Sequence, residues 1–239
     1  MQSAKSPKPL VSVIIPAFNE EKHLAKSIAA MRSSLAYANI PGEIIVVDNE
    51  STDETLKIAK RFADHVCTEK RHVIASVRNT GAAHSRGRFL IFTDADTFVP
   101  LNLVKEFVAA LSGKAVVVGC NVMPHPLKPL ERRLFKIFNL MLRVSVLHGA
   151  AFSGNCVGYR KEIFKKLNGF DERWVASEDH ELSKRAAKLG KPVFLKHLTV
   201  TTSNRRVRKL GLPGLILGWS KTTILYVLGI KSKHYPITR

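Results

Sequence analysis

Short apolar runs alternate with helix-like segments through the first half of this 239-residue chain, and this alternation restricts the fold more than any other feature. The runs Val11–Ile15, Glu43–Asp48 and Phe89–Thr93 are almost continuously apolar inside, which is typical of strands buried on both faces of a parallel sheet. The segments between them carry apolar residues at helical spacing, as at Leu24 and Ile28. The pattern predicts an α/β domain with a mostly parallel sheet and helices on both faces.

Turn and capping residues set the expected bounds of the elements. We expect strands at about residues 11–15, 43–48, 65–68, 89–93, 115–122 and 155–160. We expect helices at about residues 19–35, 53–63, 79–87, 101–112, 130–147, 161–167 and 177–189. Asn19 is the expected N-cap of the first helix, because an Asn side chain accepts hydrogen bonds from the free N–H groups of a first turn. We divide the chain into a domain over residues 1–203 and a basic, partly apolar helical extension over residues 204–239.

Positive charge is concentrated in the second half of the chain. The formal net charge is +19; residues 1–119 hold 15 basic and 12 acidic side chains, whereas residues 120–239 hold 23 and 7. This imbalance implies an anionic partner, which can be nucleic acid, a phospholipid surface or a phosphorylated substrate. Three widely spaced cysteines and the lack of a secretory signal favour a reducing, cytoplasmic location.

A basic cluster lies beside the one long apolar segment of the second half. Arg205, Arg206, Arg208 and Lys209 directly precede Leu210–Ile230. Basic residues next to an apolar segment are typical of a helix that lies on anionic lipid. We therefore favour peripheral attachment to the cytoplasmic face of a membrane; the alternative is a basic helix that packs as part of a soluble fold.

Polar residues follow three of the expected strands, where ligands bind in open α/β sheets. They are Pro16-Ala-Phe-Asn-Glu20, Asp48-Asn-Glu-Ser-Thr-Asp53 and Asp94-Ala-Asp96. The pair Asp94 and Asp96 suits Mg²⁺ or Mn²⁺, which bind few protein ligands and keep substrate phosphates. An Asp-x-Asp can also be a solvated turn, but its position after a buried strand favours metal binding.

Other residues near these strand ends have two interpretations each. The Asp48 carboxylate can accept a hydrogen bond from a base N–H or a ribose hydroxyl, or it can stabilise a turn. Asp53 begins an expected helix and is more typical of a helix cap. The small residues of Asn79-Thr-Gly-Ala-Ala83 at an expected helix start permit close approach of an anion. Ser177-Glu-Asp179 can be a helix-capping cluster or can supply a catalytic carboxylate whose ionised form the helix dipole favours.

Taken together, these segments resemble family 2 glycosyltransferases, which are inverting, nucleotide-sugar-dependent enzymes of the GT-A fold. The resemblance rests on six segments over about residues 10–200: Val13–Glu20, Ile45–Asp53, Asn79-Thr-Gly, Phe92–Asp96, Gly169–Glu172 and Glu178-Asp179. The fold it implies is a Rossmann-like α/β sheet. The Q-x-x-R-W motif of processive synthases is missing, which indicates addition of one sugar.

The resemblance also implies roles for individual residues. The base and ribose pocket would be lined by Pro16, Ala17, Asn19, Glu20 and Asp48, and the ribose and diphosphate bordered by Asn79, Gly81, Arg86 and Asp94. The metal pair would be Asp94 and Asp96, with Asp179 as the catalytic base beside Glu178. The donor sugar or acceptor would meet Ser153, Gly154 and Asn155. Trp174 can stack on a sugar or pack in the interior, and His197 is a weak candidate for a third metal ligand.

The function implied is a metal-dependent, inverting transfer of one sugar from a UDP- or GDP-sugar, with Mn²⁺ or Mg²⁺ as cofactor. The expected acceptor is lipid-linked, such as a polyprenyl phosphate or glycolipid, or is a saccharide, as in cell-envelope glycan synthesis. A sugar-phosphate nucleotidyltransferase is an alternative, although Pro16–Glu20 stands where its Gly-rich basic loop belongs. A nucleic-acid-binding protein is the other alternative, and we do not favour it because few aromatic residues accompany the basic ones.

Overall fold

The computed structural model describes residues 8–228 and 230, and its elements alternate as the sequence predicts in the first half. The strands are β1 (Val11–Ala17), β2 (Gly42–Asp48), β3 (His65–Thr68), β4 (Phe89–Thr93), β5 (Thr97–Phe98), β6 (Ala115–His125), β7 (Cys156–Arg160) and β8 (Lys191–Ser203). The helices are α1 (Leu24–Ala38), α2 (Thr55–Phe62), α3 (Ile74–His84), α4 (Leu103–Ser112), α5 (Pro129–Ser145), α6 (Lys161–Lys166), α7 (Glu178–Ala187) and α8 (Arg205–Val227), with a 3₁₀ turn at Val146–His148.

One sheet of eight strands runs through the molecule in the order β3-β2-β1-β4-β7-β6-β8-β5. The strands β3, β2, β1 and β4 are parallel to one another. β7 lies antiparallel between β4 and β6, whereas β6 and β8 are parallel and β5 pairs antiparallel with the end of β8. The predicted α/β class with a mostly parallel sheet is therefore confirmed.

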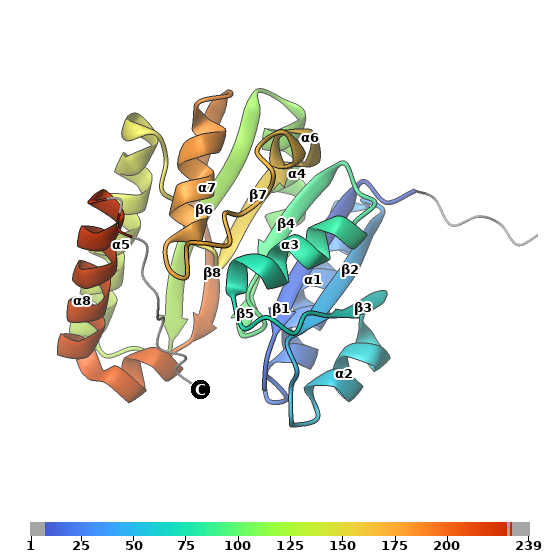
Figure 1. Ribbon diagram of the computed structural model, residues 1–239, viewed down its shortest axis with the longest axis horizontal. Coiled ribbons are helices and arrows are strands. Elements are labelled where there is room, and N and C mark those ends of the chain that lie inside the picture. The colour runs from blue at the N-terminus through green and yellow to red at the C-terminus, as the bar shows by residue number, and fades with distance from the viewer. Residues whose placement is uncertain (1–7, 229, 231–239) are drawn as a thin grey trace, which may run out of the picture.

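Helices cover both faces of this sheet, and each face has its own apolar core (Figure 1). Successive side chains of a strand point to opposite faces, so Val13 and Ile15 pack with α1, α2 and α4. Ile14 packs on the other face with α3, α6 and α7. The continuous apolar character of β1 follows from this double burial.

Two helix starts differ from the sequence prediction. α1 begins at Leu24, because Asn19 adopts a left-handed φ of 53° and the Glu20 carbonyl accepts the N–H groups of His23 and Leu24. α3 begins at Ile74, which places Asn79 inside the helix and not at its start.

Gly81, also inside α3, serves packing. A Cβ atom on it would lie 2.4 Å from Ile14 Cγ2 and 2.9 Å from Val47 Cγ2. The glycine therefore lets α3 lie close against the sheet, and Gly81 and Ala82, which we expected to receive an anion, are buried against the sheet instead.

α5 and α8 form a helix pair beside the sheet (Figure 1). Phe135 of α5 packs with Val207 and Leu215 of α8, and the rings of Phe138 and Trp219 stack at 4.7 Å. Among the residues that the structure describes, no helix is both long enough and apolar enough to cross a bilayer. Residues 229 and 231–239 of the expected extension lie outside the described part of the chain, and a separate unit over residues 204–239 stays a prediction.

Candidate active site

The sheet topology brings the polar strand ends together. β2, β1 and β4 are adjacent and parallel, so all three strands end at the same edge of the sheet, here called the carboxyl edge. Their last residues are Asp48, Ala17 and Thr93. β7 runs the opposite way, so the residues that precede it begin at this same edge. The Thr93 hydroxyl donates to the carbonyl of Asn155 at 3.1 Å, which joins the loop before β7 to the end of β4.

Asp94 lies at the junction of β4 and that loop. Its Oδ1 accepts from Arg78 Nη2 at 3.0 Å, and its Oδ2 accepts from Asn155 Nδ2 at 3.0 Å. Desolvation raises the pKa of Asp94; Arg78 opposes this shift and the negative charge of Asp96 adds to it. The carboxylate is thus oriented by two donors while it still faces a second carboxylate.

Arg78, on α3, is a buried cation that the sequence analysis did not single out. Its Nη1 donates to Glu178 Oε1 at 2.6 Å, and its Nη2 donates to the carbonyl of Gly154 at 3.2 Å as well as to Asp94. Burial opposes its charge, but Asp94 and Glu178 outweigh that effect and raise the pKa of Arg78. One guanidinium therefore ties together β4, the loop before β7 and the start of α7.

Glu178 and Asp179 open α7 with different surroundings. Glu178 is buried against Arg78, and desolvation followed by the charge of Asp179 raises its pKa to about 7 although Arg78 opposes the shift. Asp179 is partly exposed; its Oδ2 accepts from the N–H of Gly154 at 2.5 Å and its Oδ1 from the N–H of His180 at 2.8 Å. The geometry makes Asp179 the carboxylate that a ligand can reach and Glu178 a residue that holds Arg78.

The side chain of Asp96 accepts hydrogen bonds from the end of β8 and the start of α8. Its carboxylate accepts from the hydroxyls of Thr202 and Ser203 at the end of β8 and from Arg205 Nη2 at 3.2 Å. Arg205 also donates to buried Glu20 at 2.8 Å. The start of α8 is therefore part of the site, a role that the sequence analysis did not foresee.

Two of the arginines that we expected to face lipid are paired within the chain. Arg205 contacts Glu20 and Asp96, and Arg208 contacts Glu131 of α5 at 2.9 Å. The expected basic cluster before Leu210–Ile230 is thus partly neutralised by this chain's own carboxylates.

Asp48 has an unsatisfied buried oxygen. Its side chain lies at the end of β2, and its Oδ2 accepts from the N–H of Ser51 at 3.3 Å. Its Oδ1 is buried and has no hydrogen-bond partner among the described residues. Pro16 and Ala17 pair with Val47 and Asp48 in the neighbouring strand, and Asn19 Oδ1 accepts from the N–H of Thr52 at 2.8 Å. The loops after β1 and β2 are therefore joined by a hydrogen bond and lie beside the unpaired Oδ1 atom of Asp48.

A divalent cation suits the carboxyl edge by the chemistry of its donors. Asp94 and Asp96 are hard oxygen ligands one residue apart, and Mg²⁺ or Mn²⁺ binds through one or two carboxylates together with substrate phosphates. Within the described residues, no cluster of three His, Cys, Asp or Glu side chains could hold a metal. His197 is placed elsewhere, where its ring pairs with Glu106 of α4 at 3.4 Å.

Several other predicted site residues lie away from this group. Asn79 donates to the carbonyl of Phe170 at 2.9 Å and to Glu172 at 3.0 Å, and so holds a loop. Arg86 follows α3 and donates to Glu43 at 2.8 Å, at the edge where the parallel strands begin. Trp174 is buried and packs edge-on against Tyr226 of α8 at 5.4 Å, which agrees with the packing interpretation. Ser153, Gly154 and Asn155 do lie beside Asp94 and Asp179.

The chain is similar in sequence to known glycosyltransferases. The AglE glycosyltransferase of Haloferax volcanii is 27% identical over 198 residues, which are 79% of this chain and 65% of AglE. The dolichyl-phosphate beta-glucosyltransferase of Mus musculus is 29% identical over 156 residues, 56% of this chain and 47% of that one. This chain therefore spans between about half and two thirds of these relatives' length.

A solved structure shares the fold. The mannosyltransferase PcManGT from Pyrobaculum calidifontis, in complex with GDP-Man and Mn²⁺, has a TM-score of 0.72 at 22% identity and covers 96% of this chain and 66% of its own. The likeness confirms the expected GT-A type of fold. Residues 12–168 match the family described as Glycosyl transferase family 2. Because this segment is well over half of the chain, the protein belongs to glycosyl transferase family 2.

Proposed function

We propose that this chain transfers a single sugar from a UDP- or GDP-sugar to an acceptor, with inversion, at a site that uses Mn²⁺ or Mg²⁺. The observation that carries the proposal is that Asp94 and Asp179 both contact the loop that contains Gly154, while Asp96 lies close enough to Asp94 to raise its pKa. Family membership and the GDP-Man and Mn²⁺ bound to PcManGT support it.

The donor's nucleotide would lie over the ends of β1 and β2. The free Oδ1 of Asp48 is a buried acceptor, and such a group favours a ligand that brings an N–H donor, because an unpaired buried acceptor costs free energy. The bases of UDP and GDP both carry a ring N–H. Asn19 and Glu20 border the same space from the loop after β1.

The diphosphate would lie over Asp94 and Asp96, which would hold the divalent cation. When bound, that cation neutralises the charge that develops on the leaving nucleoside diphosphate. Arg205 lies within hydrogen-bond distance of Asp96 and adds a positive charge at the same place. The residues of this edge therefore suit a phosphate-bearing leaving group.

Asp179 would receive the proton of the acceptor. The acceptor oxygen forms a bond to the sugar's anomeric carbon as the bond from that carbon to the diphosphate breaks, and the proton passes to the Asp179 carboxylate. Two backbone N–H groups, from Gly154 and His180, donate to this side chain and fix its orientation. An acceptor that is already an ionised phosphate would need Asp179 for orientation only.

A lipid-linked acceptor is favoured by the helix pair. α5 leaves Leu130, Ile137, Leu140, Met141 and Val144 exposed, and the 3₁₀ turn that follows it leaves Leu147 exposed. The same helix exposes Arg132, Arg133, Lys136 and Arg143. Exposed apolar residues interleaved with cations suit the surface of an anionic membrane, where each basic residue contributes about 1 kcal/mol. These residues support a membrane-bound acceptor, a polyprenyl phosphate or glycolipid, and attachment of the chain to a membrane surface. We expect this surface to be the cytoplasmic face, whose anionic lipids attract basic residues.

Nucleoside diphosphate release tests the proposal. The protein is mixed with UDP- or GDP-sugars, Mn²⁺ and vesicles that contain a polyprenyl phosphate, and wild type is compared with Asp96→Asn and Glu54→Gln. Glu54 is an exposed carboxylate paired with Lys57, so its variant should keep full activity. Asp96→Asn should lose metal-dependent release. The proposal fails if no nucleotide sugar binds or turns over, or if Asp96→Asn is as active as Glu54→Gln.

A further inference from the structure

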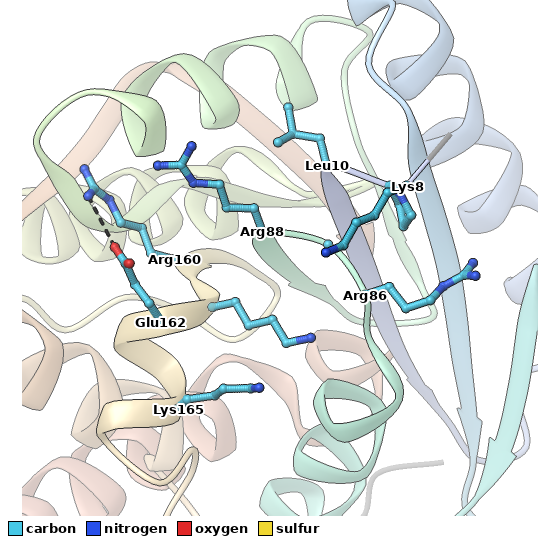
Figure 2. A pocket seen from close by; sticks show the side chains of 10 residues that line it. Lys8, Leu10, Arg86, Arg88, Arg160, Glu162 and Lys165 are labelled. Carbon is cyan, nitrogen blue, oxygen red and sulfur yellow. Dashed lines mark ion pairs between the residues drawn. The ribbon is translucent and has the colours of Figure 1, made fainter. Parts of the chain in front are cut away.

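A basic pocket lies at the edge of the sheet opposite the carboxyl edge, where β1 and β4 begin and β7 ends (Figure 2). Its volume is about 550 Å³. Six of its lining residues are cationic: Lys8, Arg86, Arg88, Arg160, Lys161 and Lys165. We call this hollow the amino-edge pocket.

The positive charge of the amino-edge pocket is only partly compensated. Arg86 pairs with Glu43, which lies outside the lining, at 2.8 Å, and Glu162, the one acidic residue among the lining residues, faces Arg160 at 3.5 Å. Lys161 Nζ donates to the carbonyl of Ser85. Among the described residues, Lys8, Lys161 and Lys165 form no salt bridge, and desolvation together with the charges of Lys165 and Lys8 lowers the pKa of Lys161 although Glu43 opposes this. Like charges held together in this way destabilise the empty pocket and favour an anion.

The lining also indicates the kind of anion. Lysine ammonium groups and arginine guanidinium groups are the side chains that bind phosphate oxygens. No aromatic side chain lines the pocket, so it offers nothing on which a nucleic-acid base could stack. The volume exceeds that of one phosphate. A compact ligand with two or more phosphate charges satisfies these conditions.

We propose that the amino-edge pocket is a second ligand site, which binds a multiply charged phosphate group of a soluble molecule or of a lipid headgroup. The site is independent of the one that takes the donor. β4 separates the two edges, and its five residues correspond to about 16 Å at the usual rise of a strand. The proposal therefore does not depend on the proposed transfer reaction.

Inorganic pyrophosphate is the probe for the soluble source. Its affinity is measured by isothermal titration calorimetry without divalent cations and at constant ionic strength. We expect Lys161→Gln/Lys165→Gln to weaken binding about 100-fold, because each lysine supplies one charged hydrogen bond. Lys166→Gln is the matched control, since this exposed lysine of α6 does not line the pocket. Arg205→Gln reports binding at the donor site.

Vesicles are the probe for the lipid source. Sedimentation with phosphatidic acid vesicles, compared with phosphatidylcholine vesicles, shows whether the same two lysines hold a headgroup. Loss of pyrophosphate binding alone in Lys161→Gln/Lys165→Gln identifies a soluble ligand, and loss of vesicle binding alone identifies a lipid. The proposal is overturned if neither probe binds, if Arg205→Gln and not the lysine pair removes pyrophosphate binding, or if Lys166→Gln has the same effect as the lysine pair.

Discussion

Removal of the Arg78 guanidinium, as in Arg78→Met, would leave two carboxylates at the carboxyl edge without their common cation. The side chain is 4% exposed and pairs with Glu178 at 2.6 Å and with Asp94 at 3.0 Å. Loss of one partner of a buried ion pair costs about 3–5 kcal/mol. We expect Arg78→Met to lower the free energy of unfolding by this amount at pH 8, measured by urea denaturation followed through tryptophan fluorescence.

The pH dependence of this loss of stability shows whether it comes from the unpaired Glu178 carboxylate or from general disruption of the packing. The pKa of Glu178 in the folded protein, about 7, lies above its ordinary value of 4.5. The folded state therefore binds this proton more tightly than the unfolded state, and stability falls as the pH rises from about 4.5 to the folded pKa. Without Arg78 the folded pKa of Glu178 is higher still, so its contribution to the fall continues above pH 7 with a slope of at most about 1.4 kcal/mol per pH unit, and Asp94, whose pKa Arg78 also lowers, adds to it.

Two further variants make the Arg78 prediction refutable. Adding Glu178→Gln to Arg78→Met removes one of the two carboxylates that titrate there, so the slope above pH 7 should decrease to the part that Asp94 contributes, and much of the stability should return. Arg173→Met, which removes an exposed arginine paired with Asp171, should leave the free energy of unfolding close to that of the wild type, because exposed ion pairs contribute little. The reasoning is wrong if Arg78→Met matches Arg173→Met at pH 8, or if Glu178→Gln restores nothing in the Arg78→Met background.

Three other outcomes can be measured. Asp179→Asn should slow sugar transfer to a hydroxyl acceptor about 100-fold or more, because a general base is lost, while calorimetry should find donor affinity unchanged; equal loss of both would contradict this role. Gly81→Ala should lower stability by about 1–3 kcal/mol in thermal denaturation, because its Cβ overlaps neighbouring side chains, whereas Gly218→Ala, which meets nothing within 4 Å, should not destabilise α8. Leu140→Glu should reduce sedimentation of the protein with anionic vesicles. Tyr37→Glu, at an equally exposed position on α1, should not reduce it, and an equal effect of both variants would argue against α5 as the membrane surface.

The sequence predicted what depends on local pattern. The buried strands β1, β2 and β4 follow from their continuous apolar runs, and the placement of Asp48, Asp94 and Asp96 at strand ends follows from those strands. Periodicity also located α5 and α7 within a few residues.

What the sequence did not predict depends on contacts between distant segments. Arg78 directly precedes the Asn79-Thr-Gly segment but is not part of any motif that we identified, and its partner Glu178 is 100 residues away. Arg86 is close to Arg78 in sequence, but α3 carries the two to opposite edges of the sheet. The pairing of Arg205 with Glu20 needs β8 and α8 to be in place, and no local pattern indicates it. Asn19 looked like a helix cap because capping residues are common in turns as well.

The separation of these partners in sequence has a consequence for the order in which the molecule forms. Asp96 bonds to residues 106 to 109 positions later, and Glu20 bonds to one 185 positions later. Contacts of such long range form late, because the chain must close a large loop before they contribute. During synthesis the N-terminal strands emerge first, so β1, β2 and β4 can pair while Asp96 still lacks its partners. The hydrogen bonds to the side chains of Asp96 and Glu20 are therefore completed only after β8 and the start of α8 have been synthesised and have folded.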